Sequence, residues 1–179
     1  MQADRIITYE GIEPTLGENV FVAPGAWVIG DVEIGNNASI WYGSVVRGDI
    51  HYVRIGEGTN IQDGTIVHVT HDTGPVVIGS KVTIGHRVVL HGCTVEDLAL
   101  VGMGSVVLDG AIVEKYSMVA AGAVVTPGTV VQSGMLFGGL PAKPLRELTA
   151  EEMRSFEESA AHYSEYAQAH IVSLNEQGA

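Results

Sequence analysis

A six-residue period runs through most of the chain and constrains its fold more than any other feature. The same spacing begins near Leu16 and, with short interruptions, continues to Leu90. In repeats of this kind a short strand precedes a bend, three units close one coil, and the aliphatic residues of successive coils stack into a core. The clearest run consists of Val95, Val101, Val107, Val113, Val119, Val125 and Val131.

We therefore predict a mainly β protein built as a parallel β-helix. The 23 glycines suit the many bends, because glycine accepts backbone angles that other residues avoid. Aromatic residues make up only 6% of the chain, which also favours small repeating units. A β-sandwich is the alternative, but its strands alternate with a period of two and would not hold a six-residue phase.

The sequence divides into three parts, because the repeat ends after Val131. We expect a β-helix domain at residues 1–135, a connector at 136–148 and a carboxy-terminal helical segment at 149–179. Two prolines in the connector disfavour regular hydrogen bonding there.

The carboxy-terminal segment begins with a capping signal. Thr149 and Glu152 have the spacing of a capping box, in which each side chain binds the backbone of the other residue. Apolar residues then recur at helical spacing. We predict one amphipathic helix over about residues 150–174 that packs along the β-helix.

The period slips twice in the middle of the chain. Val67 to Ile78 is one residue short of two repeats, and Leu90 to Val95 is one residue short of one. Both slips lie beside histidines. Departures from a local pattern tend to mark functional sites, so the slips point to this region.

Three of these histidines, His68, His86 and His91, stand where the repeat needs no side chain for packing. His68 and His91 each follow an inward-facing aliphatic residue and should point outward, whereas His86 lies near a bend. Coils are about 4.8 Å apart and imidazole binds zinc at about 2.0–2.1 Å, so side chains of neighbouring coils can converge on one ion. Three histidine ligands leave a position open for water, as in catalytic sites. We hypothesise a catalytic divalent metal; three unrelated surface histidines are the alternative.

The composition argues against several classes of partner. The formal net charge of -12 disfavours nucleic acid and anionic membrane surfaces, because no basic patch is available. The chain has no run of about twenty apolar residues, so we expect no membrane span. Cys93 is the only cysteine, so no intrachain disulfide can form. Without a recognisable secretory signal, we expect a cytoplasmic protein.

Four segments together resemble the γ-class carbonic anhydrase family: VRGD (46–49), NIQDGTIVH (60–68), IGHRVVLHGC (84–93) and LVGMGSVVLDGA (100–111). The resemblance covers essentially the whole chain. It implies a left-handed β-helix and a homotrimer with a metal at each subunit interface. The metal would be zinc, with iron or cobalt as alternatives.

The resemblance also implies roles for individual residues. His68 and His91 would bind the metal from one subunit, and His86 would bind it from the neighbour. Arg47 and Asp49 match an intersubunit salt bridge near the metal, and a plain surface ion pair is the alternative.

Two further residues match the family near the reaction site. Gln62 corresponds to a glutamine that orients the hydroxide or the substrate; an outward polar residue is the alternative. Tyr163 corresponds to a tyrosine that the last helix brings near the cleft, and it also lies on the apolar stripe of that helix.

The implied activity is that of a zinc-dependent lyase that hydrates CO₂ reversibly to bicarbonate. The segment after His68, VTHDTGPVVIG, is short and lacks the glutamate that serves as a proton shuttle in family members with an acidic loop. Three alternatives therefore stay open. They are a hexapeptide-repeat acyltransferase that uses one histidine as general base, a CoA thioester hydrolase, and a non-catalytic metal-binding scaffold.

Overall fold

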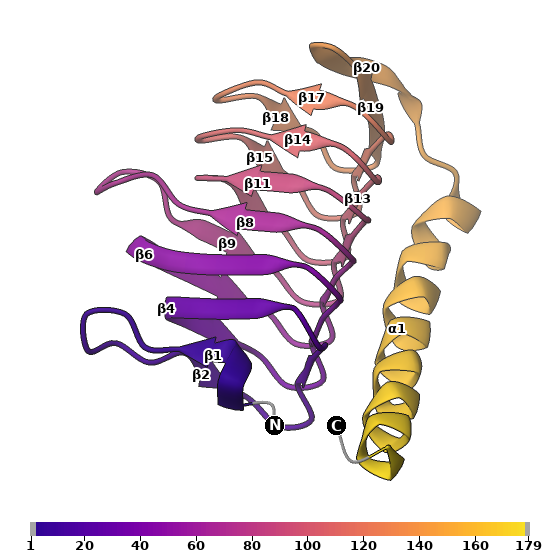
Figure 1. Ribbon diagram of the computed structural model, residues 1–179. Helices are drawn as coiled ribbons and strands as arrows, with labels where there is room; N and C mark the ends of the chain where they lie inside the picture. Colours follow the sequence, from indigo (N-terminus) through magenta and orange to yellow (C-terminus); the bar gives the residue numbers. More distant parts are fainter. Residues whose placement is uncertain (1–2, 178–179) are drawn as a thin grey trace.

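The structure, a computed structural model, describes residues 3–177, and it confirms the mainly β prediction. Residues 1, 2, 178 and 179 of the predicted first and last segments lie outside the described part. Short parallel strands stack as coils of a β-solenoid, and one long helix, α1 (Ala150–Glu176), runs beside the stack (Figure 1). A short 3₁₀ turn, η1 (Ala3–Arg5), precedes the first strand.

The strands form three faces of the solenoid, and neighbours within each face pair in parallel. Face 1 contains β1 (Ile6–Ile7), β4 (Trp27–Ile34), β6 (Val45–Ile55), β8 (Ile66–His68), β11 (Val89–His91), β14 (Val106–Val107) and β17 (Val124–Val125). The long strands β4 and β6 continue into face 2. Face 2 also contains β2 (Thr15–Leu16), β9 (Val76–Ile78), β12 (Thr94–Val95), β15 (Ile112–Val113) and β18 (Val130–Val131).

Face 3 closes each coil and supports the helix. Its parallel strands are β3 (Phe21–Val22), β5 (Ser39–Ile40), β7 (Asn60–Ile61), β10 (Thr83–Ile84), β13 (Leu100–Val101), β16 (Met118–Val119) and β19 (Met135–Gly139). The segment predicted to be a connector is more regular than we expected. It forms β19 and β20 (Ala142–Glu147), which pair antiparallel across the end of the solenoid.

The six-residue period corresponds to a stacked aliphatic core. On face 1, Val46, Val67, Leu90 and Val107 are in register on adjacent coils, and all four are fully buried. Such stacking removes apolar surface from water along the whole axis and stabilises each coil through its neighbours.

Several bends hold residues that the sequence pattern does not mark as bend-formers. Lys81, Arg87, Leu98 and Tyr116 all have φ between 54° and 57°, in the left-handed region that favours glycine. The regular coil above and below holds these residues in a costly conformation. Arg87 places this strain directly after His86.

The predicted capping box is present at the start of α1. The Thr149 side chain accepts a hydrogen bond from the Glu152 backbone, and the Glu152 carboxylate accepts one from the Thr149 backbone. The helix contacts β3, β5, β7 and β10 of face 3. An aromatic cluster fixes it there: Trp41 packs edge-on against Phe21 and Tyr163, with ring centroids 5.3 and 5.4 Å apart.

Within residues 3–177, no helix has the length and hydropathy to cross a membrane. The cytoplasmic location stays a prediction.

Candidate metal centre

Two of the three predicted ligands lie side by side at the end of face 1. Arg47, His68 and His91 are in register on β6, β8 and β11, so their side chains project from adjacent coils. The rings of His68 and His91 have centroids 5.3 Å apart and are partly exposed. We call this group, with Asp49, the His91 edge.

Asp49 holds the ring of His68. Its Oδ1 lies 3.0 Å from His68 Nε2, and its other carboxylate oxygen accepts a hydrogen bond from Arg47. Burial opposes the ionisation of Asp49, but the hydrogen bonds from His68 and Arg47 outweigh it and lower the pKa of this carboxyl group. In the single chain, the predicted Arg47–Asp49 pair thus closes within one subunit.

Asp109 holds the ring of His91 from the next coil. Both carboxylate oxygens lie 3.2 Å from His91 Nδ1, and Thr70 Oγ1 lies 3.3 Å from the same nitrogen. The Thr70 hydroxyl also donates to Asp109 Oδ1. The hydrogen bond from Thr70, together with the weaker one from His91, lowers the pKa of Asp109 against the effect of burial.

His86 lies at the opposite side of face 1, on the bend between β10 and β11. Its Nδ1 is 2.9 Å from Asp63 Oδ2. Gln62 lies on the neighbouring coil, where its backbone donates to Ile84 and its amide Nε2 donates to Asn60 Oδ1 at 3.1 Å. The amide oxygen Oε1 of Gln62 therefore remains available to another hydrogen-bond partner. We call Gln62, Asp63 and His86 the His86 edge.

Tyr163 of α1 faces the His86 edge. Burial raises the pKa of its hydroxyl, and the negative charge of Asp63 raises it further. Tyr163 is thus close enough to Asp63, the carboxylate that holds His86, for the charge of Asp63 to act on it. The place of Tyr163 in the active site stays a prediction.

The width of face 1 separates the two edges. His86 lies on the bend before β11 and His91 is the last residue of that strand, whereas two nitrogens bound to one ion at about 2.1 Å are at most about 4.2 Å apart. Within residues 3–177 of a single chain, no three His, Cys, Asp or Glu side chains are placed to hold a metal. The donor chemistry nevertheless suits a divalent metal, because each of the three imidazoles has one nitrogen held by a carboxylate.

Asp63 and Asp109 were not predicted from the sequence, and Asp49 was expected only as the partner of Arg47. Asp109 follows His91 by 18 residues, which is three repeats or one coil, so a search at the coil period would have found it. Asp63 and Thr70 carry no such signal, because phase slips lie between them and their histidines.

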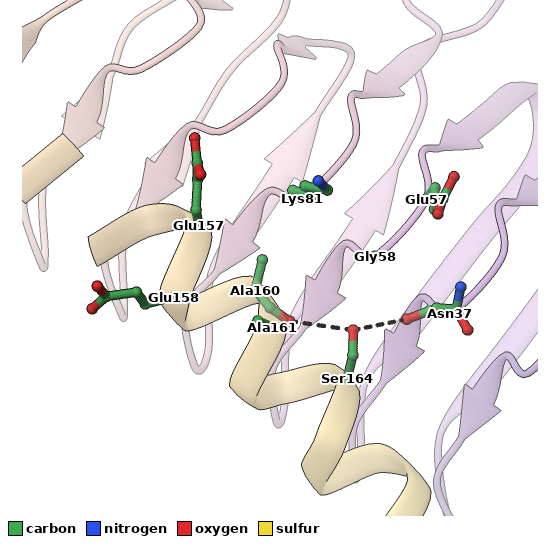
Figure 2. A pocket seen from close by; sticks show the side chains of 9 residues that line it. All are labelled: Asn37, Glu57, Gly58, Lys81, Glu157, Glu158, Ala160, Ala161 and Ser164. Carbon is green, nitrogen blue, oxygen red and sulfur yellow. Dashed lines mark hydrogen bonds between the residues drawn. The ribbon is translucent and has the colours of Figure 1, made fainter. Parts of the chain in front are cut away.

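A groove of about 520 Å³ lies between α1 and the bends of face 3 (Figure 2). Glu57 and Lys81 line it from the solenoid, and Glu157 and Ser164 line it from the helix. Ser164 Oγ donates to the backbone oxygen of Asn37 at 3.4 Å across the seam. None of the predicted site residues lines this groove, so it is separate from the candidate metal centre.

Comparisons with known proteins agree with the repeat and with the family resemblance. The family described as bacterial transferase hexapeptide (six repeats) matches residues 13–48. The chain is 54% identical over 164 residues to gamma carbonic anhydrase 1, mitochondrial, of Arabidopsis thaliana, covering 89% of this chain and 60% of that protein. It is 52% identical over 148 residues to a probable carbonic anhydrase of Methanocaldococcus jannaschii, covering 83% and 92%.

A solved structure with the same repeat has a closely similar fold. A hexapeptide transferase family protein from Anaplasma phagocytophilum superposes with a TM-score of 0.90 and 48% identity, covering 93% of this chain and 98% of that one. The fold and the repeat place the molecule in the class of hexapeptide-repeat β-solenoids. Within that class, the chain belongs to the γ-class carbonic anhydrase family. The chain spans about 60% of the length of the Arabidopsis relatives.

Proposed function

We propose that the protein is a γ-class carbonic anhydrase-like enzyme that hydrates CO₂ reversibly at a metal held between subunits of a homotrimer. One observation carries the proposal. Three carboxylate-supported histidines lie on two opposite edges of the same face, so only a second copy can unite them. The His86 edge of one subunit would meet the His91 edge of the next.

An outward apolar column on face 1 supports this assembly. Six residues in register project from successive strands between the two edges: Trp27, Val45, Ile66, Val89, Val106 and Val124. A contact that joins one edge to the opposite edge of a neighbour repeats head to tail, and it closes into a ring when the rotation between subunits divides a full turn. Three flat faces around one axis would bury the column and form three equivalent sites.

The residues of the two edges would have separate roles in the reaction. His68 and His91 of one subunit and His86 of its neighbour would hold zinc, which when bound brings the pKa of its water to about 7. Gln62, fixed through Asn60, would orient the hydroxide or CO₂ with its free Oε1. Arg47 and Asp49 would keep the ring of His68 in place and set the register of the subunits.

Tyr163 would line the same cleft from α1 as a neutral hydroxyl. Its pKa is raised further above its ordinary value of 10.0, so it stays protonated at neutral pH and can donate a hydrogen bond toward substrate.

The alternatives make different demands on these residues. An acyltransferase would need one histidine as general base, so three histidines with three matched carboxylates favour a metal site. A thioester hydrolase would use the same metal, and a scaffold would keep it for stability alone. A metal assay separates the acyltransferase from the other three functions, and an assay of CO₂ hydration separates the carbonic anhydrase from the thioester hydrolase and the scaffold.

The first experiment is to replace His91 with alanine and measure bound zinc in the purified trimer, with His162→Ala as the control. We expect zinc to be lost in the first variant and kept in the second, because His162 is exposed on α1 and its ring stacks on Tyr166 of the same helix. Undiminished zinc in His91→Ala would refute the site. The metal-loaded wild type should then be assayed for CO₂ hydration by stopped flow.

A further inference from the structure

Thr70, Gly92 and Asp109 form a contact that spans three coils at one corner of the solenoid. Thr70 follows β8, Gly92 follows β11 and Asp109 follows β14, so the three residues lie on successive turns. The outer two turns are separated by about 9.6 Å, twice the strand spacing. Short Thr and Asp side chains can meet across that distance only if the middle turn leaves room, yet the Thr70 hydroxyl reaches Asp109 Oδ1.

Gly92 provides that room. A Cβ atom at this position would lie 2.6 Å from Asp109 Oδ1 and 3.2 Å from Thr70 Oγ1, and the φ of Gly92 is +54°. Its corner is also shorter than the next one. Only Gly92 and Cys93 separate β11 from β12, whereas residues 108–111 separate β14 from β15. The phase slip between Leu90 and Val95 is thus the feature that lets the neighbouring coils touch.

The contact surrounds one atom of His91. Nδ1 faces both oxygens of Asp109 at 3.2 Å and Thr70 Oγ1 at 3.3 Å. An ionised carboxylate only accepts hydrogen bonds, and the Thr70 proton is already committed to Asp109, so Nδ1 must carry the ring proton. Nε2 is then the nitrogen with a free lone pair.

We propose that Thr70 and Asp109 are positioning residues that fix the tautomer and the orientation of His91, so that Nε2 is presented to the metal. The inference rests on the proposed function, because it assigns His91 to a metal. It extends that function to two residues that do not touch the ion. Gly92 serves the same purpose by being small.

Asp109 could simply shape its bend, as Asp97 does where its Oδ1 accepts the backbone N–H of Ser80 at 2.8 Å. Asp109 differs in that its carboxylate contacts the Thr70 hydroxyl and the ring of His91. Asp97→Asn is therefore a matched control, with the same loss of charge at a bend without histidine.

The experiment compares Asp109→Asn, Thr70→Val, Thr70→Ser and Asp97→Asn in the full-length assembled protein. Zinc affinity is measured by competition with a chromophoric chelator, and cobalt-substituted protein gives the visible absorption spectrum. In metal-free wild-type protein, long-range ¹H–¹⁵N spectra report which nitrogen of His91 carries the proton. Urea unfolding of each variant checks that the fold is retained.

We expect the wild type to be protonated at His91 Nδ1. Asp109→Asn should weaken zinc binding about 10- to 100-fold. The Thr70 hydroxyl would donate to the new amide oxygen, so the amide N–H₂ would face His91 and favour the opposite tautomer. Thr70→Val should weaken binding about 2- to 10-fold, the effect of one hydrogen bond, and Thr70→Ser should restore it. Asp97→Asn should match the wild type.

Several results would overturn the inference, even where Asp109→Asn fails to fold. A wild-type His91 protonated at Nε2 would do so alone, as would unchanged zinc affinity in Thr70→Val. His91→Ala separates the two proposals. If it keeps its zinc, the proposed function fails; if it loses zinc while Asp109→Asn binds normally, only the positioning role fails.

Discussion

Replacing Trp27 with aspartate tests whether face 1 is the subunit interface. Trp27 begins the outward apolar column, and 41% of its surface is exposed in the single chain. It lies two coils away from His68, in register through Val45 and Ile66. Any loss of metal in this variant would therefore arise through the assembly and not through a direct contact.

The magnitude follows from the exposed area. A buried tryptophan removes up to about 250 Å² from water, so 41% corresponds to about 100 Å² that a partner can still cover. At about 25 cal/mol per Å² this contributes about 2.5 kcal/mol per subunit, or about 7.5 kcal/mol for a trimer. A loss of this size weakens the assembly about 10⁵- to 10⁶-fold, and an unpaired buried carboxylate costs several kcal/mol more.

The assay is sedimentation of the purified variant at micromolar concentration, with zinc content measured on the same sample. The matched control is Ile112→Asp on face 2, where the isoleucine is 36% exposed and lies outside the proposed interface. We expect Trp27→Asp to be monomeric with little zinc and Ile112→Asp to stay trimeric with full zinc. A trimeric, zinc-loaded Trp27→Asp protein would refute the assignment of face 1.

Three further predictions follow from single residues. Leu90→Ala leaves a cavity between in-register neighbours held by backbone hydrogen bonds, so it should cost about 3–4 kcal/mol in urea unfolding of the metal-free protein at fixed concentration. Burial raises the pKa of Cys93 to about 12, so a thiol reagent at pH 8 should label it only after unfolding; rapid labelling of the native protein would contradict this. Hydrogen bonds from Arg146 and the Thr149 backbone lower the pKa of Glu152 from 4.5 to about 2. Its stabilising effect on α1 should be complete above pH 4.5 and lost as the pH falls toward 2, as seen by circular dichroism, and Glu152→Gln should not show this change.

The repeat could be predicted from the sequence because each inward aliphatic residue contacts its equivalents one coil away. The spacing of these residues along the chain therefore indicates the packing directly. The capping box was equally local, since Thr149 and Glu152 are three residues apart. The hairpin of β19 and β20 was not predicted, because its pairing depends on the open end of the solenoid and its prolines argued against strands.

The candidate ligands could be named from the sequence, but their arrangement could not. His68 and His91 lie side by side because β8 and β11 pair in register. A phase slip separates the two residues in the sequence, so counting repeats does not predict this pairing. Asp63 and Asp109 resemble ordinary bend residues in the sequence, since each precedes a glycine. The coil period connects Asp109 with His91, but only the structure shows that Asp63 faces His86.

The division of the ligands between two edges links metal binding to assembly. If each ion takes two histidines from one subunit and one from the next, the free energy of binding three ions is also free energy of association, because the separated chain offers no complete site. Removing zinc should then weaken the trimer, and diluting the trimer should release zinc, each by the same factor. The carboxylates strengthen the coupling between metal binding and assembly, because they hold the rings of both edges in place beforehand. Less side-chain freedom is then lost when the edges meet. A solenoid whose coils stabilise one another within a single chain can in this way make its reactive site depend on a second copy.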